Sequence, residues 1–415
     1  MNETRNIIIG FDLGSKTSQL CYYDRKEKEP ISLSPKAGSN QYQFPTCLSK
    51  KSGEDIWHYG FEAEYFIREK DEISIDSFYE ACHQDELISV DGQMRHPWEI
   101  LAIFLEEVLT MLGVADPIRQ ISAIMTTTKE LTGPMVRNLQ KAYERVGFTK
   151  SRCFLQDYEE SFYYYVLNQK TEYRNRKIAW FTFEEEEVAY AHLVTDNKTK
   201  PILVTIEKGK TISLPSDSLG KDLQFYQLIH ESFKTDNYAS VYIVGEGFEK
   251  EWAKRSIPLL CKGQRHVFYG NNLFVKGACC GAREKVEEKN LKNYLYAGSS
   301  LVKYNIGMEM LVQGNNAWYP VIEAGKNWYE SVKEFEIILD DKKELIFRVY
   351  PMDGKTATSY SMQLPGLPKR PNRTTRLHIL VAYESPTVCV ITVKDLGFGE
   401  MYPGSGQVWT EKMSW

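Results

Sequence analysis

The 415-residue sequence has no excess of basic charge, no long apolar run and no paired cysteine motif. Its 51 lysines and arginines are outnumbered by 56 aspartates and glutamates, and the net charge of −5 is not that of a typical nucleic-acid-binding protein. No apolar run is long enough to cross a bilayer, and the N-terminus lacks the apolar segment of a signal peptide. We therefore expect a cytoplasmic protein that binds neither nucleic acid nor membrane.

Metal-binding patterns are also lacking. None of the eight cysteines forms a CxxC pair, and the seven histidines show neither zinc-finger nor HExxH spacing. Cys279 and Cys280 are adjacent, which suits neither an ordinary disulfide nor a metal clamp. We expect reduced, mostly buried thiols and no metal site formed by cysteine or histidine.

Four consecutive glutamates, Glu184 to Glu187, separate two apolar runs at 178–181 and 188–191. The two runs are typical of strands that pair through a tight turn. Such turns usually contain Gly, Asn or Asp, because the backbone there needs positive φ. Four like charges repel one another, so the acidic turn needs a functional explanation.

The rest of the chain predicts two kinds of structure. Strand and helix patterns alternate over residues 1–300, which indicates an α/β domain with a mixed or parallel sheet. After residue 300 the helical period disappears, and apolar residues alternate between turns about every ten positions, as in a β-sandwich. The clearest segments are strands near 6–11, 18–23 and 121–126, and helices near 97–112 and 133–146.

The segment GFDLGSKTS at 10–18 lies between two predicted strands. A glycine-containing turn can direct backbone N–H groups at a phosphate, and hydroxyl groups add further donors. Asp12 could hold a magnesium ion through water. A tight hairpin with a polar tip is an equally good interpretation of this segment alone.

Several motifs follow in a set order: IMTTT at 124–128, FLQD at 154–157, SLGKD at 218–222, VYIVGEGFEKEW at 241–252 and LFVKGACCGA at 273–282. Together with GFDLGSKTS, this series resembles the nucleotide-binding domain of the seventy-kilodalton heat-shock chaperone family, a member of the actin and sugar-kinase ATPase fold. The family's first phosphate loop reads GIDLGTTNS. Further along, YNIGME at 304–309 and MQLPGLP at 362–368 resemble parts of its substrate-binding domain.

The resemblance implies an α/β actin-like ATPase fold with ribonuclease H-like duplicated halves at 1–300, and an all-β sandwich at 301–415. It implies ATP or ADP with magnesium as ligand, and it places a carboxylate, Asp157, near the metal. The nucleotide-binding positions that it implies are Asp12, Gly14, Ser15, Lys16, Thr17, Ser18, Gly220, Gly245 and Gly247.

The acidic turn departs from this pattern. The family's second phosphate loop, DLGGGT, falls on Thr182-Phe183-Glu184-Glu185-Glu186-Glu187. Glutamate side chains then occupy space that the phosphates need, and one repulsion at about 4 Å near a surface costs about 4 kcal/mol. We expect little or no ATP hydrolysis, at most weak nucleotide binding, and no confident catalytic residue beyond the remnants Asp12 and Asp157.

Three other departures agree. Residues 71–128 contain no lysine where the family has its catalytic lysine, and Lys70 is a marginal substitute. The adenosine motif VGGxxRxP is reduced to Gly245-Glu246-Gly247. Only 24 residues separate Gly220 from Val244, so the helical subdomain that clasps the adenine is absent.

We expect a degenerate chaperone or co-chaperone that binds protein or peptide clients, with a conventional chaperone or co-chaperone as a further partner and without the family's helical lid. The peptide groove would lie near Leu311 and near Ile338 and Leu339, although these residues could equally complete the core. The alternatives are an active MgATP-dependent ATPase or kinase with an unusual cleft, and an actin-like assembly protein. The segment DLGFGE at 395–400 also looks like a phosphate loop, but its all-β surroundings favour a bulge or turn.

Overall fold

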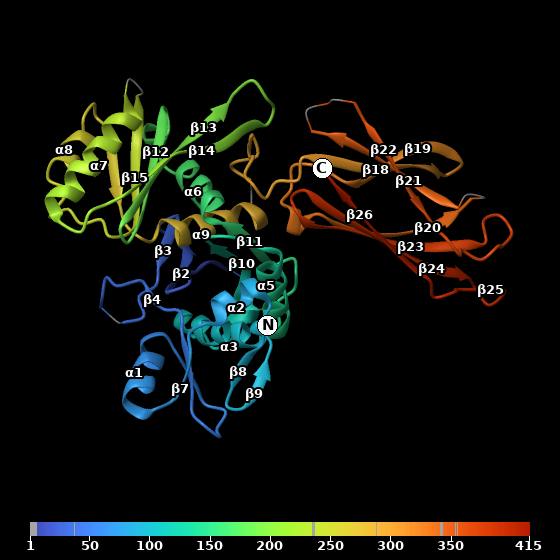
Figure 1. Cartoon of the computed structure of the whole chain (residues 1–415), viewed down its shortest axis with the longest axis horizontal. Coiled ribbons are helices and arrows are strands. Elements are labelled where there is room, and N and C mark those ends of the chain that lie inside the picture. Colours follow the sequence, from blue (N-terminus) through green and yellow to red (C-terminus); the bar gives the residue numbers. More distant parts are fainter. Residues whose placement is uncertain are drawn as a thin grey trace. The chain divides into compact units, whose positions relative to one another are not determined.

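The computed structural model describes residues 6–36, 38–234, 237–287, 289–340, 343–352, 354 and 356–415. The chain divides into two compact units, Met1–Tyr296 and Ala297–Trp415 (Figure 1). Across the described ranges, no helix is both long and apolar enough to span a membrane.

The first unit contains two large sheets. One has the strand order β11-β10-β1-β2-β3, with β4 paired to β2. Strands β1, β2 and β3 are antiparallel neighbours, whereas β10 and β11 run parallel to β1. The bounds of these strands are β1 Ile7–Leu13, β2 Thr17–Asp24, β3 Glu29–Ser32, β4 Phe44–Pro45, β10 Ile121–Thr128 and β11 Cys153–Asp157.

The second sheet repeats this arrangement. Its order is β16-β15-β12-β13-β14-β17, with an antiparallel meander β12-β13-β14 and parallel β15 and β16 on the other side of β12. The two sheets therefore share one strand order, three meander strands followed by two parallel strands. The bounds are β12 Lys177–Glu184, β13 Glu187–Asp196, β14 Ile202–Ser213, β15 Tyr238–Glu246, β16 His266–Tyr269 and β17 Tyr294–Tyr296.

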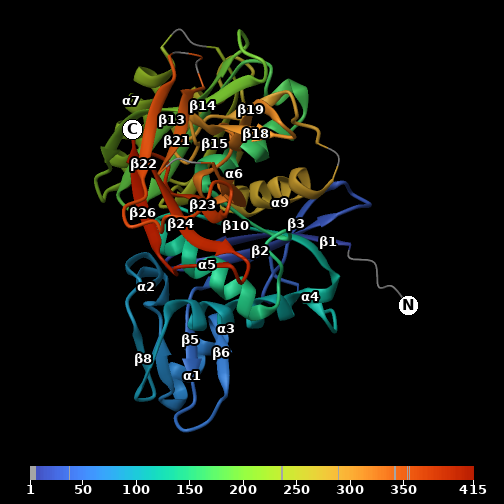
Figure 2. The same cartoon turned by 90° about the vertical axis from the view of Figure 1, so that its right-hand side faces the viewer.

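Helix α9, Leu273–Val286, packs on β1, β2 and β10 and against α6, Tyr158–Leu167 (Figure 2). Small residues allow this close packing: a Cβ added to Gly277 would lie 2.0 Å from the carbonyl oxygen of Ser161. The helix thus connects the first sheet to the start of α6, where the cleft described below has its floor.

Two helices predicted from apolar periodicity are present. Helix α5 spans Gly133–Val146, and α3 spans Pro97–Leu109, with a short 3-10 turn before Gly113, whose φ is +64°. Two short strands, β5 Leu48–Lys50 and β6 Trp57–Tyr59, come before a region that was not predicted. That region contains α1 Gly60–Lys70, β7 Ile73–Ile75, α2 Phe78–Gln84, β8 Ile88–Val90 and β9 Gln93–Arg95.

In the second half of the first unit, only short segments connect the helices to the strands around β15. Helix α7, Ser218–Phe233, is followed by β15, which begins at Tyr238, and a short α8, Ser256–Leu260, follows β15. The chain between α7 and β15 is therefore too short for a helical subdomain.

The second unit consists of two sheets. One has the order β19-β18-β21-β22, and the other has β20-β23-β24-β25 with β26 also paired to β24. Strands β20 and β21 follow each other in sequence but lie in different sheets, and buried residues of the two sheets include Phe347 on β21 and Ile379 on β23. The bounds are β18 Tyr304–Val312, β19 Asn315–Ile322, β20 Val332–Leu339, β21 Glu344–Pro351, β22 Thr358–Gln363, β23 Thr375–Ser385, β24 Val388–Phe398, β25 Tyr402–Pro403 and β26 Val408–Ser414.

The segment 395–400 forms a β-bulge. The pairing of β23 with β24 shifts register between Arg376 and Leu377, which face Gly397 and Asp395. Asp395 is buried and accepts hydrogen bonds from the Arg370 guanidinium at 2.8 Å, and Gly397 has a φ of +64°. This carboxylate stabilises the sheet, which confirms the interpretation as a bulge.

Candidate functional site: an acidic cleft in the first unit

A cleft of about 850 Å³ lies in the first unit. It is lined from one half by the β1–β2 hairpin, and from the other by the β12–β13 hairpin and the end of β15. Its lining residues are Asp12, Gly14, Ser15, Lys16, Thr17, Gln19, Gln43, Tyr79, Lys129, Tyr158, Thr182, Phe183, Glu184, Glu185, Glu186, Glu187, Val244, Gly245, Glu246, Asn271 and Phe274.

The acidic turn forms one wall of this cleft. Glu184 pairs with Glu187 across the β12–β13 hairpin, so Glu185 and Glu186 make a two-residue turn. Glu185 has a φ of +53°, a value that glycine or asparagine usually takes in such turns. All four glutamates and Thr182 line the cleft, and the acidic turn therefore gives it a strongly negative wall.

Two lysines from the opposite half contact this wall. The Lys16 ammonium forms an ion pair with Glu185, and the Lys129 ammonium lies 2.8 Å from a carboxylate oxygen of Glu184. The ion pair with Lys16 lowers the pKa of Glu185 from its ordinary value. The two halves of the first unit are thus linked across the cleft by the protein's own charges.

The floor of the cleft holds a buried carboxyl group. Asp12 is 5% exposed, and the Tyr158 hydroxyl donates a hydrogen bond to its Oδ1 at 2.9 Å. Burial raises the pKa of Asp12 to about 7, although the bond from Tyr158 lowers it in part. The Tyr158 ring stacks on Phe274 with ring centroids 4.0 Å apart, which fixes the hydroxyl in place.

The glycines at the end of β15 allow close packing of backbone on backbone. Gly245 has a φ of +99°, and an added Cβ would lie 1.9 Å from the carbonyl oxygen of Phe183. Gly247 similarly approaches the carbonyl oxygen of Glu185. The N–H of Gly245 donates to Asn271 Oδ1 at 3.0 Å, so this N–H already has an acceptor within the protein.

Three predicted nucleotide-binding positions lie outside the cleft lining. Ser18 is buried in β2, where its hydroxyl is 2.7 Å from that of Thr46, because alternate residues of a strand face opposite sides. Gly220 is in the first turn of α7, and its N–H donates to the capping carboxylate of Asp217 at 2.7 Å. Gly247 packs against the acidic turn without lining the cleft. None of these three residues lines the cleft, and their role in ligand contact stays a prediction.

Asp157, the carboxylate predicted near the metal, has a structural role. It caps the N-terminus of α6, where its Oδ1 accepts the N–H of Glu160 at 2.8 Å. Burial raises its pKa to about 6. The carboxylate is used for helix capping, and the neighbouring Tyr158 is the residue that lines the cleft.

Lys129, Tyr158 and Gln19 are among the cleft residues that were not predicted from the sequence. Lys129 comes one residue after the stretch that was searched for a catalytic lysine, directly beyond the end of β10. Its place was a usable signal, because β10 runs parallel to β1, whose C-terminal end carries Asp12. Lys70, by contrast, is exposed at the end of α1.

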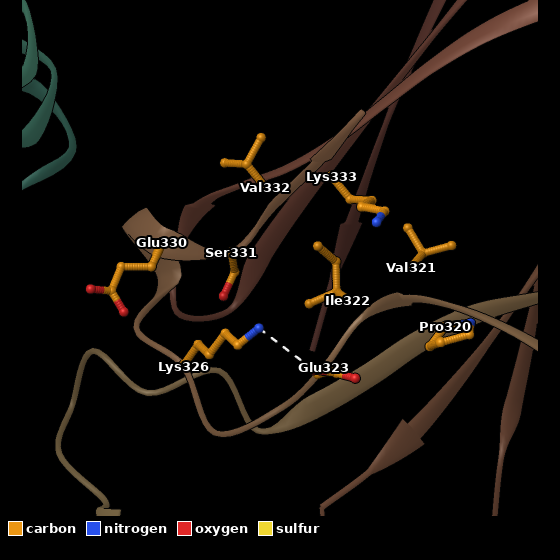
Figure 3. Close-up of a pocket in the computed structure, with 9 residues that line it drawn as sticks. All are labelled: Pro320, Val321, Ile322, Glu323, Lys326, Glu330, Ser331, Val332 and Lys333. Atoms are coloured by element: carbon orange, nitrogen blue, oxygen red, sulfur yellow. Dashed lines mark ion pairs between the residues drawn. The ribbon is translucent and has the colours of Figure 1, made fainter. Parts of the chain in front are cut away.

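The predicted peptide-binding residues lie in the second unit. Leu311 and Ile338 are 56% and 53% exposed, and Leu339 is half-buried opposite Thr375. They belong to different sheets, β18 in one and β20 in the other. One hollow of this unit, about 320 Å³, is lined by other residues, among them Ile322, Val332 and the Glu323–Lys326 ion pair (Figure 3).

Comparison with protein families finds two matches. The model of a family of unknown function (DUF5716), C-terminal part, matches residues 29–299. The model of a domain of unknown function (DUF8552) matches residues 301–415. No curated protein matches the chain. Neither matching model is that of the heat-shock family, so that resemblance stays a prediction.

Metal ligands do not cluster in the described part of the chain: no group of three or more His, Cys, Asp or Glu side chains there could hold a metal ion. The acidic turn presents its carboxylates side by side along a hairpin, and two of them are engaged by lysines. The cleft is best described as a negative, polar groove with an aromatic floor.

Proposed function

This chain belongs to DUF5716, a family of unknown function, and we propose that it is a heat-shock-70-like binding protein that works without hydrolysing ATP. In this proposal the first unit has the actin-like fold of duplicated halves. The repeated strand order of its two sheets supports that assignment. The proposed setting is the cytoplasm.

The observation that carries the proposal is the engagement of both cleft lysines by the acidic turn. Lys16 pairs with Glu185, and Lys129 pairs with Glu184. In the family that the sequence resembles, the corresponding hairpins hold phosphates. Here carboxylates occupy that position and neutralise the cations that a triphosphate would need.

The ligand in this proposal is a protein or peptide client, bound by the second unit. Leu311 and Ile338 are more than half exposed at strand ends, where an extended peptide can add backbone hydrogen bonds and fill apolar pockets. A conventional chaperone or co-chaperone is the further partner.

Isothermal titration calorimetry with MgATP tests the proposal on the full chain. The expected dissociation constant is weaker than about 1 mM. The double variant E184Q/E185Q should bind MgATP more tightly than the wild type, because it releases both lysines. The matched control, E231Q/E249Q, removes two carboxylates that do not line the cleft and should behave like the wild type.

Phosphate release in the steady state gives the second readout. No turnover above background is expected from the wild type. Tight MgATP binding by the wild type, together with turnover that D12N abolishes, would establish the alternative of a working ATPase.

A further inference from the structure

A buried side chain on the cleft floor has an unused hydrogen-bond acceptor. Gln19 is 3% exposed and lines the cleft. Its Nε2 donates to the carbonyl oxygen of Asn271 at 2.7 Å, which fixes the orientation of the amide. Its Oε1 has no hydrogen-bond partner in the described structure. Buried acceptors are almost always paired, so this oxygen marks a place where a donor is expected.

A second acceptor lies beside it. Asp12 of β1 is the direct partner of Gln19 in the β1–β2 ladder, so the two side chains lie on the same face of the sheet. Tyr158 donates to one carboxyl oxygen of Asp12. An amide oxygen and a carboxyl group therefore lie side by side under the floor of the cleft, and both accept hydrogen bonds.

The walls of the cleft favour a positive occupant. Glu184 to Glu187 and Glu246 supply five carboxylates, against two lysines that are already ion-paired at the rim. The stacked rings of Tyr158 and Phe274 line the floor next to Asp12, and aromatic faces attract cations. The chain's own two cleft cations are held at the acidic turn, and neither donates to Gln19.

We propose that the floor of this cleft binds an organic cation, a primary ammonium or guanidinium group, whose N–H donors meet Gln19 Oε1 and the Asp12 carboxyl. The group is carried either by a small polyamine or by a basic side chain of a bound protein. This site rests on the proposed function in one respect: the cation can bind only if nucleotide does not fill the cleft.

Calorimetry on the full chain at low ionic strength tests it with four probes: spermidine, a short peptide with one lysine, magnesium chloride and MgATP. We expect saturable binding of spermidine or of the peptide, and the tighter of the two identifies the source of the cation. The variant Q19M removes the acceptor without changing charge or size greatly. It should weaken amine binding about tenfold or more, the scale of a hydrogen bond to a charged group.

Two further variants separate a specific role of Gln19 from a general effect of substitution. Q19E adds a carboxylate of nearly the same shape and should tighten amine binding. The matched control, Q224M, changes an exposed glutamine on α7 and should leave binding unchanged.

Three outcomes would overturn the inference: no amine binding, amine binding that Q19M leaves unchanged and that reflects diffuse attraction to the acidic surface, or binding of magnesium alone. The MgATP arm is separate. Tight nucleotide binding contradicts the proposed function, whereas absence of amine binding with no nucleotide binding contradicts only this inference.

Discussion

At the residue scale, Gly245 shows how a single hydrogen sets the approach of two strands. Its φ of +99° and the 1.9 Å between an added Cβ and Phe183 O leave no room for a side chain. We expect G245A to lower the free energy of unfolding by about 3 kcal/mol, from backbone strain and overpacking together. Urea denaturation measures this change.

Gly263 provides the matched control. It has a φ of +74°, but an added Cβ would meet no atom within 4 Å. G263A should therefore cost only the strain of a left-handed backbone, about 1 kcal/mol. Equal losses in the two variants would show that steric contact at Gly245 is unimportant.

Asp12 makes the stability of the protein depend on pH. Burial raises its pKa from 3.8 to about 7, so the folded state holds this proton more tightly than the unfolded state. Stability from this group is greatest at low pH and falls as the pH rises through that interval, by at most about 1.4 kcal/mol per pH unit.

The variant D12N removes the titration while keeping an oxygen that can accept from Tyr158. Relative to the wild type, D12N should gain stability between about pH 4 and about pH 8, as measured by urea denaturation at each pH. A difference between the two proteins that is constant over this range would contradict the prediction.

The residues of the site were only partly predictable. The hairpin around the acidic turn was predicted from the two apolar runs that flank it, and its place at the cleft from the resemblance. Gln19 and Tyr158 were not found, since the partner of each, Asn271 and Phe274, is more than 100 residues away in sequence. Ser18 lies outside the cleft lining, between Thr17 and Gln19 that line it, because a one-residue step along a strand reverses the side chain.

At the scale of elements, the two halves that form the cleft are linked by charge, because Lys129 directly after β10 pairs with Glu184 of the β12–β13 hairpin. A double-mutant cycle with K129Q and E184Q should give a coupling energy of about 0.5 kcal/mol, the usual value for an exposed pair. The coupling should disappear near 1 M salt because of screening, with a Debye length of about 3 Å.

Hydrogen exchange shows whether this coupling crosses the cleft. Both K129Q and E184Q should increase exchange at the C-terminal end of β10, which precedes Lys129, and at the tip of the β12–β13 hairpin. The same substitutions in the exposed Lys210–Glu231 pair, which joins β14 to α7, should affect neither place. Unchanged exchange in all four variants would mean that the ion pair does not hold β10 and the β12–β13 hairpin together.

Long elements were predictable and short ones were not. Helices α3 and α5 bury continuous apolar faces of three turns or more, so periodicity revealed them. Helix α1 buries only Gly60 and Ala63, and β7, β8 and β9 have three residues each. Such segments are fixed by tertiary contacts, which leave little periodic signal.

At the scale of the whole molecule, the proposed function assigns client binding to the second unit, and this assignment can be tested. If the second unit holds clients, the full chain should bind extended apolar peptides with an affinity that nucleotide does not alter. L311D combined with I338D should abolish this binding, because both side chains are more than half exposed and their loss should not unfold the sheets. Fluorescence anisotropy with labelled peptides measures the affinity.

The control for this experiment is V408D. Val408 is 54% exposed on β26, so the substitution also places one acid on an exposed apolar site of the second unit. Binding that survives L311D/I338D, or that V408D abolishes equally, would mean that clients bind at another site.

The change from an α/β region to an all-β region was predictable from the loss of helical period, but the separation of β20 and β21 into different sheets depends on pairings that are remote in sequence.

The lysine–glutamate pairs across the cleft also have a consequence for how the sequence varies in evolution. If glutamates stand where a phosphate once bound, the lysines at 16 and 129 are retained only for their acidic partners, and neither residue of a pair can change alone. The family model of DUF5716 covers positions 129 and 184, so among its members the charges at these two positions should be exchanged or lost together. A member with glycines in that turn should keep the lysine at 129 only if it still binds nucleotide.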